Sequence, residues 1–259
     1  MAASIKSHSV GATMVLTISN PEQRNALGPE LYAAGVEALS VAESNDEVRS
    51  VVIVGEGKHF CAGGNLQRLL GNRQLSPEVQ DQSVEGLHSW IETIRAFPKP
   101  VIAAVEGACA GAGFSLTLAC DFVFAARDAV FVMAYSNVAI SPDGGGSWSL
   151  ARSLPRASVM QLLMAGERIT PERLLQLGVL NAVSEPGEAL AQALAMADKL
   201  NARAPNVLAS IKELVNDAGA NTLPEHLSAE RQHFVRNLHH PNGGEGISAF
   251  LEKRTAVYR

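Results

Sequence analysis

Two short apolar segments, each followed at once by a loop rich in glycine and alanine, constrain the fold of this chain most strongly. SVVIV at 50–54 leads into GEGKHFCAGGNL, and VIAAV at 101–105 leads into EGACAGAGF. Apolar runs of this length that end at glycine are typical of strands buried on both faces, as in a parallel sheet covered by helices. Because glycine and alanine carry little or no side chain, backbone N–H groups in both loops can approach a bound group closely. The two segments therefore predict an α/β core with two backbone-lined loops.

The hydrophobic periodicity along the chain predicts alternating strands and helices. Strands are expected at 8–19, 121–126 and 129–133, and helices at 29–43, at 77–97, from about 113 and from about 146. Beyond Gly187 the pattern is helical throughout. We therefore expect an α/β core over residues 1–200 and a helical region over 201–259. The pattern alone suggests a doubly wound sheet. The size of a pocket is expected to depend on residues 67–90.

Composition and charge exclude several classes of function. The net charge is -5 and the basic residues are scattered, which argues against nucleic-acid binding. No apolar stretch approaches the ~18 residues of a membrane helix, and the start lacks a leader pattern, so we expect no membrane association and a cytoplasmic location. Three cysteines indicate reduced thiols, and seven histidines without HExxH spacing predict no metal site.

The two loops suit chemistry in which negative charge develops on a thioester oxygen. Preorganised backbone N–H groups stabilise such an oxyanion, and the second loop runs directly into the apolar helix FSLTLAC, whose N-terminus adds free N–H groups and a positive dipole end. Two other interpretations stay open for each loop. Both could be tight strand-to-helix turns, or they could bind phosphate, although neither has the spacing of GxxxxGK[ST] or GxGxxG.

Several motifs resemble the enoyl-CoA hydratase/isomerase, or crotonase, family over nearly the whole chain. They are NPEQRNAL (20–27), FCAGGNL (60–66), KPVIAAVEGACAGAGFSLTLACD (99–121), ISPDGGGSW (140–148), ERITPERLLQLGVLNAV (167–183) and EGISAFLEKR (245–254). The resemblance implies a spiral of ββα units with a helical C-terminal part that forms homotrimers or hexamers. It also implies an acyl-CoA substrate, with coenzyme A present only as part of the thioester and no separate cofactor.

The resemblance also assigns roles to individual residues. It implies that the N–H groups of Gly64 and Ala112 are the two oxyanion donors. Coenzyme A is expected along a set of residues near the first loop, with Tyr135 also in the substrate site. The set is Arg24, Ala26, Ala62, Gly63, Asn65 and Leu66. Asn65 stands where the family often has aspartate, and Phe250 and Lys253 match residues that reach the coenzyme A of a neighbouring subunit.

The expected acid or base is a single aspartate. Hydratases of the family use two glutamates, and the matching residues here are Ser115 and Tyr135, neither of which is a good base at neutral pH. Asp143, just before three glycines, is the carboxylate that remains. The surrounding motif is most similar to the isomerase branch, which includes 3,2-enoyl-CoA isomerases and the ring-1,2-epoxyphenylacetyl-CoA isomerases of phenylacetate catabolism. The resemblance thus predicts an enoyl-CoA isomerase with Asp143 as general acid and base.

Four alternatives remain open from the sequence. The chain could be an enoyl-CoA hydratase, or a dehalogenase or thioester hydrolase in which Asp143 is the nucleophile and His88 the base, with Tyr135 in place of the dehalogenase tryptophan. Cys61 could be a thioesterase nucleophile, although a small core residue is the simpler interpretation. The chain could also be a non-catalytic coenzyme A- or RNA-binding protein of the same fold.

Overall fold

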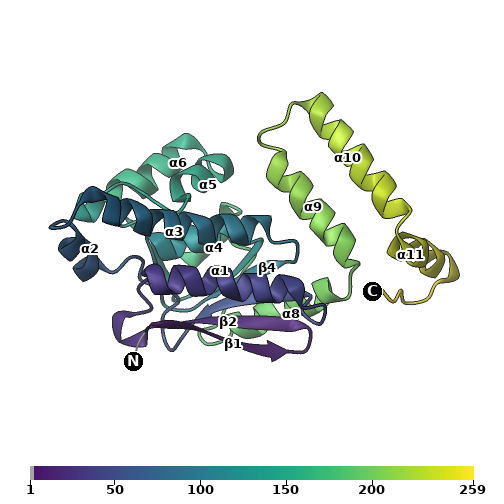
Figure 1. Ribbon diagram of the computed structural model, residues 1–259, viewed down its shortest axis with the longest axis horizontal. Helices are drawn as coiled ribbons and strands as arrows, with labels where there is room; N and C mark the ends of the chain where they lie inside the picture. The colour runs from purple at the N-terminus through teal and green to yellow at the C-terminus, as the bar shows by residue number, and fades with distance from the viewer. Residues whose placement is uncertain (1–2) are drawn as a thin grey trace.

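The computed structural model describes residues 3–259 and contains two β-sheets (Figure 1). The larger sheet has the order β1-β2-β3-β4-β6-β9 and is parallel from β2 onward, with β1 antiparallel at its edge. Its strands are β1 (Ser4–Val10), β2 (Thr13–Ser19), β3 (Ser50–Gly55), β4 (Val101–Val105), β6 (Phe122–Ala126) and β9 (Ala182–Ser184). The smaller sheet has the order β5-β7-β8, formed by β5 (Ala108–Ala110), β7 (Val130–Val132) and β8 (Arg168–Ile169).

Successive ββα units connect the two sheets. After β4 the chain enters β5 and then helix α4 (Ala112–Ala119), and after β6 it enters β7 and, further on, α5 (Gly146–Ser153). The segment after β3 is similar, because Cys61 forms a parallel bridge to Cys109 of β5. Each turn thus gives one strand to the larger sheet and one short strand or bridge to the smaller sheet. The expected spiral of ββα units is confirmed. The doubly wound sheet suggested by periodicity is wrong, because a second short strand follows each of β4 and β6 before the helix.

Alternating side chains of the parallel strands face two different helical layers. Val51 and Ile53 belong to the core cluster that includes residues of α1 (Pro29–Ser44) and α3 (Pro77–Ala96). Val52 faces the other cluster, where Ala189, Ala193 and Ala197 of α8 (Ala189–Asn201) pack on the sheet. Burial on both faces is the reason that these strands are wholly apolar in sequence.

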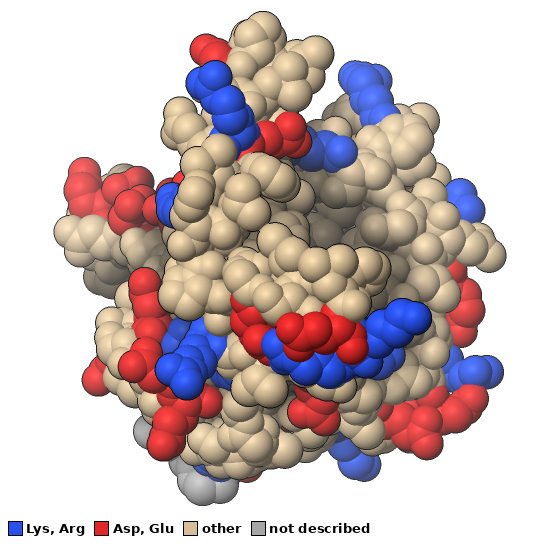
Figure 2. Space-filling view, turned by 90° about the vertical axis from the view of Figure 1, so that its right-hand side faces the viewer, with Lys and Arg blue, Asp and Glu red and all other residues tan. Residues whose placement is uncertain are grey.

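Three helices at the end of the chain extend away from the sheets (Figure 1). They are α9 (Pro205–Asp217), α10 (Leu223–Leu238) and α11 (Pro241–Glu252). Figure 2 views this end of the molecule, where uncharged residues cover much of the surface around a hollow. The exposed apolar side chains of these helices are Ile211, Val215, Leu223, Leu227, Phe234, Val235, Leu238, Ile247, Phe250 and Leu251. The division into domains at residue 200 stays a prediction, although the last helix that packs on the sheet ends at Asn201.

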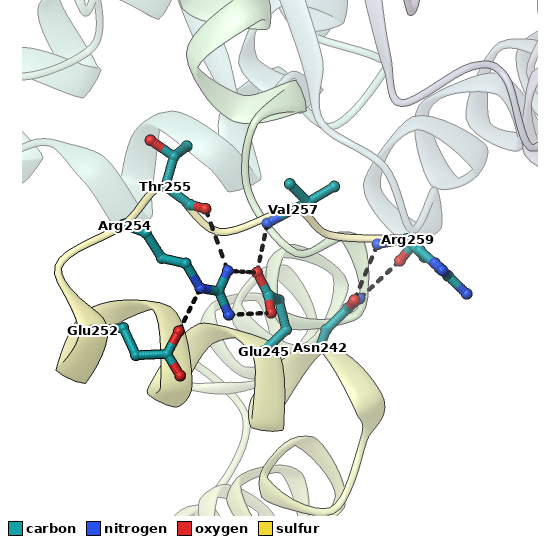
Figure 3. A network of polar contacts seen from close by, with 7 residues as sticks. All are labelled: Asn242, Glu245, Glu252, Arg254, Thr255, Val257 and Arg259. Carbon is teal, nitrogen blue, oxygen red and sulfur yellow. Dashed lines mark hydrogen bonds and ion pairs between the residues drawn. The ribbon is translucent and has the colours of Figure 1, made fainter.

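The chain after α11 folds back along that helix (Figure 3). The guanidinium of Arg254 contacts Glu245 at 2.6 Å and Glu252 at 2.7 Å, and the N–H of Val257 donates to the Glu245 carboxylate. Arg259 and Asn242 exchange two hydrogen bonds in the same region. These contacts attach the end of the chain to the first turns of α11.

Several elements differ from the sequence predictions, which did not include the short strands β5, β8 and β9. The single strand expected at 8–19 is a hairpin, in which β1 and β2 pair around Gly11, whose φ of +56° favours glycine. Residues 67–90 contain most of helix α2 (Leu66–Asn72) before α3 begins.

The remaining helices are α6 (Arg156–Met160), a π-helical turn (Gln161–Ala165), α7 (Pro171–Gln176) and 3₁₀ turns at Pro21–Gln23 and Ser136–Val138. No helix within residues 3–259 has both the length and the apolar character needed to cross a bilayer.

Candidate active site

The first glycine-rich loop is held so that the N–H of Gly64 points away from the neighbouring backbone at Leu27. The carbonyl of Gly63 accepts a hydrogen bond of 2.8 Å from the N–H of Leu27. Because the C=O and N–H of a trans peptide point in opposite directions, the N–H of Gly64 faces the other way. Gly63 itself has a φ of +92°, and an added Cβ would lie 2.8 Å from the carbonyl oxygen of Ala110. Glycine is therefore required both by conformation and by the closeness of the second loop.

The second loop presents the N–H of Ala112 in a similar way. The carbonyl of Gly111 accepts a hydrogen bond of 2.9 Å from Ser115 inside α4, so the N–H of Ala112 points out of the helix N-terminus. Gly111, with a φ of +48°, supplies the conformation that begins the helix. Within residues 3–259, neither Gly64 nor Ala112 has a backbone acceptor for its N–H.

Both loops line one small cavity of about 100 Å³. Tyr135 and Asp143 lie on its wall together with Gly64 and Ala112, so the four predicted residues meet in one place. A larger cavity of about 670 Å³ adjoins the small one. The two share Leu66, Leu69, Val138, Ile140 and Asp143. A thioester oxygen at the loops and an acyl group in the larger cavity could therefore be bound together.

Two neighbouring hydroxyl groups hold Asp143 in place. The hydroxyl of Tyr135 donates to Oδ1 of Asp143 at 2.6 Å, and the hydroxyl of Ser115 donates to the Asp143 backbone carbonyl at 3.0 Å. Burial, and next the nearby Asp143 carboxylate, raise the pKa of Tyr135 well above its ordinary value, so its hydroxyl stays protonated and able to donate. Oδ2 of Asp143 has no partner within residues 3–259 and remains available as a base.

The three glycines after Asp143 allow its loop to approach α4. Gly144 and Gly145 have φ values of +57° and +74°, and an added Cβ on Gly146 would lie 2.6 Å from the Ser115 hydroxyl oxygen. Side chains at these positions would push the loop away from α4. The GGG motif is therefore a condition for the contact between Ser115 and Asp143.

Comparison with known proteins identifies the family of this chain. The family model described as enoyl-CoA hydratase/isomerase matches residues 9–259. The chain belongs to the enoyl-CoA hydratase/isomerase family. It is 35% identical over 256 residues to the 1,2-epoxyphenylacetyl-CoA isomerase of Escherichia coli K12, covering 98% of this chain and 97% of the relative. It is 34% identical over 249 residues to a probable enoyl-CoA hydratase of Bacillus subtilis 168, covering 95% and 94%.

A solved structure extends the comparison. The crystal structure of an enoyl-CoA hydratase from Polaromonas sp. JS666 is 70% identical, with a TM-score of 0.98 and coverage of 99% of this chain and 100% of that one. Similar proteins thus carry both isomerase and hydratase names. The similarity assigns the family and does not distinguish between these two reactions.

The residues predicted to bind coenzyme A separate into two groups in this family member. Those near the first loop lie together: Ala62 donates its N–H to the Arg24 carbonyl at 2.9 Å, and the Asn65 amide donates to Gln23 at 2.5 Å. Asn65 also caps α2 by accepting from the N–H of Arg68. Phe250, 84% exposed, and Lys253 lie at α11, on the opposite side of the molecule from α2 (Figure 1). The structure does not bring these two residues to the site of the same chain.

His88 and Cys61, the alternative base and the alternative nucleophile, lie in different environments. His88 lines the larger cavity, and its Nδ1 lies 4.0 Å from Glu85. Cys61 is fully buried, and burial raises the pKa of its thiol to about 12, which disfavours a nucleophilic thiolate at neutral pH. Its sulfur instead accepts a hydrogen bond of 3.3 Å from the N–H of Gly63. Cys61 is thus a core residue beneath the first loop.

The sequence predictions missed the walls of the larger cavity. Arg73 of the α2 C-cap and Gln80 of α3 line it at a distance from the glycine-rich loops. The sequence did contain one signal of this wall, the helical spacing of Leu66, Leu69, Leu70 and Arg73, but it extends over only a short segment. Within residues 3–259, no three His, Cys, Asp or Glu side chains lie close enough together to bind a metal ion.

Proposed function

We propose that this chain is an enoyl-CoA isomerase that uses Asp143 as its only acid and base. The observation that carries the proposal is the position of Asp143 on the wall of the cavity that contains the N–H groups of Gly64 and Ala112. One of its carboxylate oxygens is held by Tyr135, and the other has no partner in the part of the chain that the structure describes. Ser115 and Tyr135 stand where the family's hydratases have glutamates. In this chain both hydroxyls contact Asp143, which supports a single-carboxylate mechanism.

The mechanism follows from this geometry. The thioester oxygen accepts hydrogen bonds from Gly64 and Ala112 while Asp143 removes a proton from carbon 2 of a 3-enoyl-CoA. The electrons move into a dienolate held by the two N–H groups. Asp143 then returns the proton to carbon 4, and the double bond lies between carbons 2 and 3. Each oxyanion donor can contribute about 10²–10³ in rate and a positioned base about 10²–10⁴.

Coenzyme A binding completes the proposal. The strip of residues Arg24, Ala26, Ala62, Gly63, Asn65 and Leu66 would hold the coenzyme A of the same subunit. Phe250 and Lys253 would reach that of a neighbouring subunit in a homotrimer or hexamer. The exposed apolar side chains of α9, α10 and α11 support such an assembly, because water-exposed apolar surface of this extent is typical of interfaces. Light scattering of the purified protein measures the number of subunits directly, and a monomer would contradict the assembly.

A second candidate function is dehalogenation or thioester hydrolysis with Asp143 as the nucleophile, and one observation favours it. His88 lines the same larger cavity as Asp143, so nucleophilic attack by Asp143 with His88 as base is the competing mechanism. It differs in a measurable way, because enzyme oxygen would pass to the product in ¹⁸O-water during a single turnover. Unlabelled Asp143 throughout the reaction would argue against it.

The decisive experiment is the Asp143→Asn variant, assayed with 3-enoyl-CoA for isomerisation and with 2-enoyl-CoA for hydration. We expect isomerisation to fall by about 10²–10⁴. Asp128→Asn, an exposed position in the turn between β6 and β7, is the matched control. Isomerisation by Asp143→Asn at the wild-type rate would refute the assignment. Efficient hydration by the wild type without isomerisation would favour a hydratase.

A further inference from the structure

Helices α2 and α3 each present one face to the larger cavity. From α2 and its C-cap come Leu66, Leu69, Leu70 and Arg73, and from α3 come Gln80, Val84 and His88. These spacings of three and four residues place each set on one side of its helix. Residues 138, 140, 141, 142 and 143 form the remaining wall.

The cavity has a reaction end and a distal end. Leu66 and Leu69 line the small cavity with the two N–H groups, whereas Arg73 lines only the larger one. At a rise of ~1.5 Å per residue, Arg73 lies about 10 Å along the helix axis from Leu66. On α3, Leu87 packs beside Gly144, which places the neighbouring His88 towards the reaction end. Gln80, about 12 Å earlier along α3, lies towards the other end.

Asn72, the sequence neighbour of Arg73, orients the side chain of Gln80 at the distal end. Its amide donates a hydrogen bond of 2.7 Å to Oε1 of Gln80, which brings the end of α2 beside the start of α3. With Oε1 occupied, the free group of Gln80 is the Nε2 donor. That nitrogen has no acceptor within residues 3–259.

Arg73 adds a positive charge to this end. Its guanidinium has no ion pair or side-chain hydrogen bond within the described part of the chain. The acidic side chain that lines the larger cavity is Asp143, at the reaction end. The distal end thus presents hydrogen-bond donors and a cation, while leucine, valine and isoleucine side chains form most of the wall between the two ends.

We propose that the distal end binds a carboxylate, and that the preferred substrate is an enoyl-CoA whose acyl chain ends in a carboxylate group. This inference rests on the proposed isomerase function and names the class of its substrate. The planar guanidinium of Arg73 matches a carboxylate in geometry and charge, and Nε2 of Gln80 supplies a further donor. The apolar middle of the cavity accommodates the methylene groups between the two ends. A methyl-ended chain would gain nothing from these donors.

The test compares two substrates of equal chain length, a 3-enoyl-CoA with a terminal carboxylate and its terminal methyl ester. We expect the wild type to prefer the carboxylate. Arg73→Gln is expected to lower kcat/KM for the carboxylate by about three- to tenfold, because the pair is partly solvated, and to leave the ester unchanged. Arg73→Lys should restore part of the preference, and Gln80→Leu should reduce it independently. Arg173→Gln, an exposed arginine of α7, is the charge-matched control.

A binding measurement separates this inference from the isomerase proposal. Calorimetry with the saturated thioesters of the same pair requires no turnover. Tighter binding of the carboxylate thioester by the wild type, lost in Arg73→Gln, supports the distal subsite whether or not the enoyl-CoA substrates are isomerised. If neither enoyl-CoA is isomerised, only the isomerase proposal is overturned. Equal binding of the two thioesters by the wild type overturns the subsite. Equal weakening of both in Arg73→Gln also overturns it, because Arg73 would then contact the coenzyme A or support the fold.

Discussion

The hydroxyl of Tyr135 donates a 2.6 Å hydrogen bond to Oδ1 of Asp143, across eight residues of sequence. This bond holds one carboxylate oxygen of a side chain that lines the small cavity, and the other oxygen has no partner within residues 3–259. The tyrosine is buried and retains its proton because its pKa is raised by burial and by the same carboxylate. Tyr135, which is a poor base at neutral pH, thereby positions the carboxylate that we propose as the base.

The first prediction concerns removal of this hydrogen bond. Tyr135→Phe retains the ring and its packing but leaves Asp143 with the Ser115 contact to its backbone alone. We expect kcat to fall by about tenfold, since one hydrogen bond to a charged group is worth about 1.5–3 kcal/mol and part is recovered from water. KM should change little, because the residues proposed to hold coenzyme A are on the first loop and at α11. Steady-state kinetics measure both constants, and a change confined to KM would contradict a positioning role.

The second prediction follows from the pKa values of two buried tyrosines. Burial raises the pKa of Tyr32 to about 12, and the pKa of Tyr135 is raised further. The folded protein therefore retains protons that the unfolded chain releases near pH 10. Stability from these groups is fully present below pH 10 and is lost as the pH rises through the folded-state values. We expect the free energy of unfolding to fall above about pH 10.

Denaturant titrations at several alkaline pH values would measure this decline. In Tyr32→Phe and in Tyr135→Phe the slope of stability against pH should be shallower than in the wild type. An unchanged slope in both variants would show that neither phenol carries the effect.

The core strands of the fold could be predicted from the sequence, whereas two other elements could not. SVVIV and VIAAV predicted β3 and β4 because strands covered on both faces contain few polar residues. The hairpin at β1 and β2 was missed because Gly11 is its only strong turn signal within a continuous β-rich stretch. Helix α2 was missed because it is short and two of its three leucines, Leu66 and Leu70, are exposed, so its hydrophobic periodicity is weak.

The site was accessible only in part. The family resemblance placed Gly64, Ala112 and Asp143 together, and the structure brings them to one cavity. It also predicted that Ser115 and Tyr135 do not act as bases. Their hydrogen bonds to Asp143 could not be predicted, because they depend on how α4 and the 133–146 loop pack. Such contacts between distant segments have no local sequence signal.

The third prediction compares two glycines with similar backbone conformations. Gly63 has a φ of +92° and lies against Ala110 and Ala112, whereas Gly57 has a φ of +74° with open space around its Cα. Gly63→Ala should displace the two loops from each other and lower kcat by at least about 10², because the donor geometry is lost. Gly57→Ala shares the backbone strain, of order 1–3 kcal/mol, and should retain kcat. Similar kcat values for both variants would refute the required closeness of the loops.

The fourth prediction concerns the two buried cysteines Cys61 and Cys109, each three residues before a proposed oxyanion donor. The Cys61 sulfur accepts from the N–H of Gly63, so Cys61→Ala should loosen the first loop and lower kcat several-fold, up to about tenfold. Cys61→Ser retains an acceptor and should lose less. Cys109→Ala is the matched control, because Cys109 is equally buried and its thiol contacts Thr117 of α4, but within residues 3–259 it accepts no hydrogen bond from the N–H groups of the first loop. Comparable losses of kcat in Cys61→Ala and Cys109→Ala, after correction for stability, would show that the sulfur contributes packing alone. Complete inactivity of Cys61→Ser with the fold intact would instead restore Cys61 as a nucleophile.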